Sequence, residues 1–85
     1  MQWEQARHRV GSNIRRVRTE QGMTQEALAL RSGVTRNVLI DVEFGRRGLL
    51  YERLFDIAEA LQVPVCDLLA PGERSTNRNR RTRPG

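Results

Sequence analysis

The clearest pattern of apolar and polar positions lies between residues 24 and 45. Apolar residues recur there at helical spacing on both sides of a break at Ser32 and Gly33, namely Ala27, Leu28, Val34, Leu39 and Val42. One apolar face therefore continues through a sharp corner, which is typical of two short helices joined by a tight turn. Gly33 can adopt a positive φ in the turn, and Thr24 and Thr35 can each cap the helix that follows. The pattern predicts a helix-turn-helix with helices over about 24–32 and 35–44.

The same periodicity predicts a long helix before this motif and two shorter helices after it. A helix over about residues 2–21 is indicated by Trp3, Ala6, Val10, Ile14 and Val17. A helix over about 51–61 is indicated by Leu50, Leu54, Ile57, Ala58 and Leu61. Pro64 suits the first turn of a short helix over 64–69, which Ala70-Pro71-Gly72 ends. The expected fold is all-α, with five helices.

The beginning of the first helix has two interpretations. Gly11 weakens its middle, and residues 2–9 are either a helical extension or a loose arm. Trp3 lies on the apolar stripe, and we expect it to cover the core or an interface; stacking on a base is the second choice.

At this point the chain resembles the Cro and phage-repressor type of helix-turn-helix regulators, the xenobiotic-response-element family. The resemblance runs from about Val10 to Leu69. Its most specific parts are Gly22-Met23-Thr24-Gln25-Glu26, Leu28-Ala29, Ser32-Gly33-Val34-Thr35-Arg36, Asp41-Val42-Glu43 and Gly45-Arg46-Arg47. It implies a five-helix domain that binds double-stranded DNA in a sequence-specific way.

The chain departs from the family pattern in three places. A polar pair such as Asn-Pro is usual where Gly48-Leu49 stands, and the apolar run Leu49-Leu50-Tyr51 points to an interface. Gln62 replaces the usual glycine after the fourth helix, so it either adopts a left-handed conformation or the helix ends differently. Phe44 occupies a position where a polar or basic residue is common, which removes one phosphate contact.

Length and composition restrict the protein to one small domain. Eighty-five residues form a thin core, so a dimer is expected on size alone. Cys66 is the one cysteine, which excludes an internal disulfide and fits a reducing compartment. Without an apolar run as long as a signal sequence or membrane span, we expect a cytoplasmic protein. The resemblance implies that it is bacterial or phage-encoded and associated with the nucleoid.

Charge is distributed unevenly along the chain. All fifteen basic residues are arginine; the net charge is +4 over residues 1–47, −4 over 48–73 and +5 over 74–85. A basic half opposite an acidic half suits a domain that presents one face to phosphate. We expect the domain to occupy residues 1–73 and the apolar-poor segment 74–85 to be a disordered basic tail that either follows phosphates or only adds solubility.

The second helix of the motif is expected to lie in the major groove, with its first residues at base edges. Arg36 can bridge O6 and N7 of guanine, and Asn37 matches adenine. Val38 and Ile40 flank Leu39; one of them is expected to meet a thymine methyl group, unless both only border the core. Asp41 either accepts from a cytosine amino group or, the preferred interpretation, orients Arg36 or Arg46 through a salt bridge.

Other residues are expected to bind phosphate or to hold the domain together. Gln25 begins the first helix of the motif, where the family contacts a phosphate and the helix dipole favours one. Further phosphate candidates are Thr35, Arg46 and Arg47. The resemblance also implies a partly buried ion pair between Arg18 and Glu43.

We expect a homodimer, because exposed leucines accompany the thin core and the family dimerises through its last helices. The predicted interface residues are Leu49, Leu50, Val65 and Leu68. The leading function is a transcription regulator that binds a pseudo-palindromic operator, such as a phage or plasmid repressor or a restriction-modification controller. The alternative is an antitoxin-like module of the same fold that binds a protein toxin.

An enzyme is not expected. One histidine and one cysteine, with no paired carboxylates, provide neither a nucleophile and base nor a metal cluster. The sequence therefore predicts no catalytic residue, no metal and no cofactor.

Overall fold

The computed structural model describes residues 2–71, and all five expected helices are present in it. They are α1 (Trp3–Glu20), α2 (Gln25–Ser32), α3 (Arg36–Glu43), α4 (Tyr51–Leu61) and α5 (Val65–Leu69). Each boundary lies within one residue of its predicted position, and the all-α prediction is confirmed. The predicted disordered tail, 74–85, lies outside the described residues.

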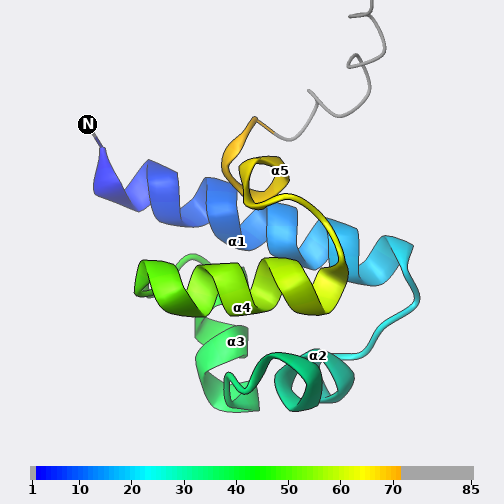
Figure 1. Cartoon of the computed structure of the whole chain (residues 1–85). Helices are drawn as coiled ribbons and strands as arrows, with labels where there is room; N and C mark the ends of the chain where they lie inside the picture. The colour runs from blue at the N-terminus through cyan, green and yellow to red at the C-terminus, as the bar shows by residue number, and fades with distance from the viewer. Residues whose placement is uncertain (1, 72–85) are drawn as a thin grey trace, which may run out of the picture.

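Helices α2 and α3 lie together at one end of the molecule, and α5 lies at the opposite end (Figure 1). Helix α1 packs on both α3 and α5, while α2 packs on α3 and α4. The two helices of the motif are therefore each supported by a different helix of the remaining domain. This arrangement fixes the angle between them.

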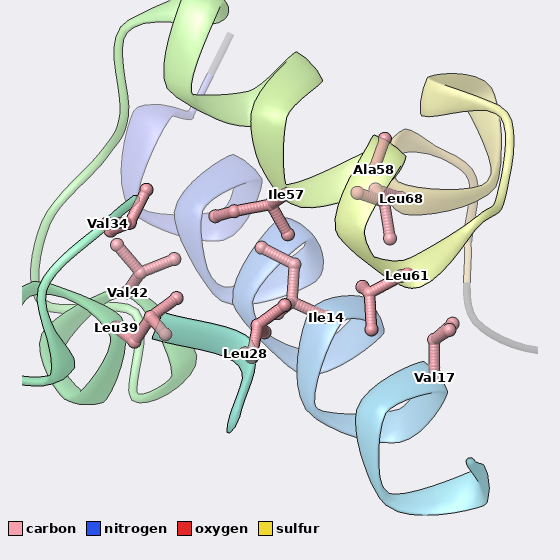
Figure 2. Close-up of a cluster of buried hydrophobic side chains, with 10 residues drawn as sticks. All are labelled: Ile14, Val17, Leu28, Val34, Leu39, Val42, Ile57, Ala58, Leu61 and Leu68. Atoms are coloured by element: carbon pink, nitrogen blue, oxygen red, sulfur yellow. The ribbon is translucent and has the colours of Figure 1, made fainter. Parts of the chain in front are cut away.

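All five helices contribute side chains to one apolar core (Figure 2). Six of its members have no exposed surface: Ile14, Leu28, Leu39, Ile57, Leu61 and Leu68. Full burial of one such side chain stabilises the fold by about 1.5–3 kcal/mol, so a core of this size suffices for a small domain only if it is well packed.

Helix α1 begins at Trp3 and continues through Gly11 without interruption, so the helical extension is the correct alternative. Gly11 is buried where α1 crosses α3, and a Cβ atom there would overlap the carbonyl oxygen of Val42. The glycine that weakens the helix by sequence is therefore what allows α1 and α3 to approach.

Helix α4 ends at Leu61, and the residue that caps it, Gln62, has φ 60° and ψ 42°. The left-handed alternative is thus the correct one, although the residue has a side chain. The amide of Gln21 donates to the Leu61 carbonyl oxygen at 2.8 Å, so α1 helps to satisfy this helix end.

Helix α5 is held by Asn13, a buried polar residue that the sequence pattern did not single out. Its Nδ2 donates to the carbonyl oxygens of Leu68 at 3.0 Å and Ala70 at 2.6 Å. The Leu68 side chain lies fully inside the core, with no surface left for a partner. The prediction that Leu68 belongs to a dimer interface is therefore wrong; its apolar spacing reflects the core of its own chain.

Candidate nucleic-acid interface

One face of α3 is buried and the opposite face forms an exposed stripe. Leu39, Val42 and Glu43 face the interior. The stripe consists of Arg36, Asn37, Ile40, Asp41 and Phe44, whose spacing places them on one side of the helix. Arg36, Asn37 and Phe44 in the stripe are exposed, and Ile40 and Asp41 are half-buried. The first two residues of the helix are thus exposed to solvent.

The turn before α3 has the predicted geometry. Gly33 ends α2 in the left-handed region, with φ 79°. The Thr35 hydroxyl accepts from the Val38 backbone N–H at 3.3 Å, and the Thr24 hydroxyl accepts from Ala27 N–H at 3.0 Å. Both predicted caps are therefore present, and the Thr35 hydroxyl hydrogen remains free to donate to a phosphate.

Val38 and Ile40 have different surroundings. Val38 packs against the core and lines a hollow beneath the loop that follows α3. Ile40 is half-buried and lies on the exposed stripe beside Asn37 and Asp41. Of the two apolar candidates, Val38 is therefore the one that borders the core.

Asp41 pairs with Arg46, which is one of the two partners expected for it. Nε and Nη2 of Arg46 donate to Asp41 Oδ1 at 3.2 and 3.0 Å. The same guanidinium lies 4.9 Å from the centre of the Phe44 ring. Phe44 therefore packs against Arg46, one of the predicted phosphate residues.

Arg36 pairs with Glu26 of α2 instead of with Asp41. Its Nε lies 3.0 Å from Glu26 Oε2, and both side chains remain largely exposed. The link therefore joins the first turn of α2 to the first residue of α3.

Arg18 and Glu43 form the ion pair that the family resemblance implies. Nε and Nη2 of Arg18 donate to Glu43 Oε2 at 2.7 Å and Oε1 at 2.9 Å. The carboxylate is 2% exposed, and Arg18 also donates to the Met23 carbonyl oxygen at 2.8 Å. This bidentate pair ties α1 to the end of α3.

Gln25 joins the same network. Its Nε2 donates to Glu43 Oε1 at 3.1 Å, which fixes the side chain at the N-terminus of α2. An amide nitrogen carries two hydrogens, so a second one remains for a phosphate oxygen. The phosphate prediction for Gln25 is compatible with this geometry.

Two arginines that the sequence pattern did not single out lie beside the predicted phosphate residues. Arg15 of α1 lines a hollow with Thr24, Gln25 and Phe44. Arg53 of α4 lines a second hollow that also includes Thr35 and Arg47. In the sequence, Arg53 belongs to the segment 48–73, which has a net negative charge. The fold brings it near the helix-turn-helix.

Most of the remaining interface candidates lie around the start of α4, and Val65 is the first residue of α5. Leu50 and Tyr51 are each 71% exposed and Phe55 is 57% exposed, with the two rings packed edge to face at 6.4 Å. Leu49 is half-buried against the core, as is Val65. Trp3 is 68% exposed and lines a hollow with Leu49 and Leu54, among other residues.

Among residues 2–71, no group of three or more His, Cys, Asp or Glu side chains is arranged to hold a metal ion. None of the five helices is both long and apolar enough to cross a membrane.

Comparison with known proteins gives consistent similarities. A family model described as Helix-turn-helix, HTH_3, matches residues 14–68. The chain is 39% identical over 66 residues to the uncharacterized HTH-type transcriptional regulator y4dJ of Sinorhizobium fredii, covering 78% of this chain and 86% of the relative.

Two solved structures are also similar. The restriction-modification controller protein C.AhdI from Aeromonas hydrophila has a TM-score of 0.71 and 32% identity, over 73% of this chain and 94% of that one. The hypothetical transcription factor NHTF from Neisseria has a TM-score of 0.79 and 31% identity, over 87% and 86% of the two chains.

Proposed function

The chain belongs to the HTH_3 helix-turn-helix family, the Cro and phage-repressor type of transcriptional regulators, and from this premise we propose that it binds a pseudo-palindromic operator as a homodimer. In this proposal α3 enters the major groove of each half-site. Arg36 and Asn37 contact base edges there, and Ile40 contacts a thymine methyl group.

The observation that carries the proposal is the exposed stripe on α3. A helix that served only to complete the core would not need an arginine and an asparagine adjacent to each other at its capped, exposed start. The Thr35 cap and the Arg18–Glu43 pair hold both ends of α3 in place. A rigid helix loses little conformational entropy on entering the groove.

Residues around the stripe can position the domain on the DNA backbone. Gln25, Thr35, Arg46 and Arg47 supply donors on both sides of α3, and Arg15 adds a further cation beside Gln25. Contacts of this kind set register and orientation but carry no sequence information. Base preference is therefore assigned to α3 alone.

The exposed apolar residues at the start of α4 support the homodimer. Leu50, Tyr51 and Phe55 are mostly exposed in the single chain, and clustered apolar side chains of this kind are typical of an interface. Leu49, next to Leu50, would border the contact, and Val65 at the start of α5 remains a candidate for the interface. Twofold symmetry would then place two α3 helices about 34 Å apart, one turn of the duplex.

A restriction-modification controller is the expected regulator class that a similar solved structure represents, because C.AhdI is described as one and the similarity covers 94% of that chain. Selection of binding sites from a random duplex pool tests the proposal. We expect an enriched pseudo-palindrome with half-site centres about 10 base pairs apart. An enriched pool without any common sequence would contradict it.

A further inference from the structure

Glu26 is the acidic residue closest to the proposed reading residue Arg36. The carboxylate Oε2 lies 3.0 Å from Arg36 Nε, and the two side chains are 68% and 50% exposed. Glu26 lies in the first turn of α2 and Arg36 is the first residue of α3. A negative charge therefore lies beside the guanidinium at the surface that would meet DNA.

The atom that Glu26 approaches determines what Arg36 can do next. Contact at Nε leaves the two terminal Nη groups, which form the fork that fits O6 and N7 of guanine. A phosphate competes for the same guanidinium on every duplex, whatever its sequence. The Glu26 carboxylate repels the full negative charge of a phosphate that approaches Arg36 more strongly than it repels the guanine edge, where O6 and N7 carry only partial negative charge.

We propose that Glu26 is a positioning residue that determines specificity by holding Arg36 toward the base edge and away from the backbone. The inference rests on the proposed function and deepens it. The ordinary role of Glu26 would be a surface ion pair and a favourable charge at a helix N-terminus. Such a role concerns stability only, so binding selectivity distinguishes the two.

The test compares Glu26→Gln with the unchanged protein on three duplexes. These are the selected operator, the operator with the Arg36-dependent base pair substituted, and an unrelated sequence. We expect affinity for the unrelated duplex to rise, because a charge that repels phosphate is lost. The ratio of operator to substituted-operator affinity should fall by about tenfold. Glu26→Asp, which keeps the charge, should restore most of that ratio.

Glu20→Gln is the matched control. Glu20 is 63% exposed, pairs with Arg16 at 3.7 Å and lies on α1, so the substitution removes the same charge from a similar environment. Its selectivity ratio should equal that of the unchanged protein. Thermal melts of all variants verify that the fold is retained.

A second set of measurements uses an Arg36→Ala background. There, Glu26→Gln should leave the selectivity ratio unchanged, because the carboxylate acts through Arg36. An equal loss of selectivity with and without Arg36 would show that Glu26 contacts a base itself, and would overturn the inference. An unchanged ratio in the single variant would overturn it as well. If the unchanged protein does not distinguish the operator from the unrelated duplex, the proposed function fails first.

Discussion

Single residues in this domain are explained by what they contact more than by their type. Gly11 is unfavourable inside a helix by about 1 kcal/mol relative to alanine. Its position against the Val42 carbonyl oxygen reverses that preference, because any side chain would push α1 away from α3. Asn13 likewise lies in the core because the carbonyl oxygens of α5 need a donor.

Gly11→Ala should therefore destabilise the domain, although the same change improves most helices. Overpacking of a close helix crossing costs about 1–3 kcal/mol. Thermal melts should show a Tm lower by several degrees, since 1 kcal/mol corresponds to roughly 4–8 °C in a domain of this size. Ser12→Ala, an exposed neighbour in α1, is the control and should leave the Tm nearly unchanged. A higher Tm for Gly11→Ala would show that the two helices can separate freely.

Gln25→Ala should weaken binding to all duplexes by a similar factor. The Gln25 side chain lies at the start of α2 and is held there by its hydrogen bond to Glu43 of α3. From this position it reaches a phosphate but no base in our proposal. A hydrogen bond to a charged group contributes about 1.5–3 kcal/mol, so affinity should fall at least tenfold. Binding isotherms on operator and unrelated DNA measure this, with the exposed Gln5→Ala as control. A loss confined to the operator would assign Gln25 to base reading instead.

At the scale of helices, the pairing between α1 and α3 is the main polar link. Arg18 and Glu43 are each at most 10% exposed, and the carboxylate also accepts from Gln25. Removal of one member of a buried pair leaves the other charge without its partner, which is more destabilising than removal of both.

Glu43→Ala should thus destabilise the fold by about 3 kcal/mol, and Arg18→Ala/Glu43→Ala together should recover part of the loss. A double-mutant cycle in thermal melts gives the coupling energy. The exposed pair Arg16–Glu20, 3.7 Å apart, provides the reference and should show a coupling below about 1 kcal/mol. Equal coupling in the two cycles would mean that burial of the Arg18–Glu43 pair has no energetic effect.

The five helices could be predicted from the sequence, because apolar spacing and capping residues act locally. Thr24, Thr35 and Gly33 mark the ends of α2 and the start of α3 by their own chemistry. Residues whose role depends on packing could not be predicted. Leu68 has the same spacing whether it faces the core or a partner, and the placement of Arg53 near Thr35 follows only from the fold.

Arg36 shows the same limit within the candidate site. Its residue type and its position at the start of α3 predict base contact, but the sequence alone offered Asp41 as its acidic neighbour. The angle between α2 and α3 brings Glu26 to it instead, and Asp41 pairs with Arg46. Contacts between helices depend on that angle, which apolar spacing does not specify.

For the whole molecule, the proposed homodimer depends on the apolar surface at the start of α4. Leu50→Glu and Phe55→Glu should each produce a folded monomer, because both side chains are mostly exposed in the single chain. Light scattering at tens of micromolar protein, before and after addition of DNA, measures the assembly. Leu30→Glu, an 86% exposed leucine on α2, is the control and should leave the dimer intact. A monomeric unchanged protein under both conditions would contradict the proposed dimer.

The central claim is that α3 reads base pairs and that Arg36 is one of the reading residues. Binding-site selection from a random duplex pool, performed in parallel with the unchanged protein, Arg36→Ala and the exposed α2 variant Arg31→Ala, tests it most directly. We predict that Arg36→Ala loses preference for one guanine in each half-site, with a cost of about 1–3 kcal/mol, while Arg31→Ala retains the full consensus. An identical consensus and affinity for the Arg36→Ala variant would contradict the account.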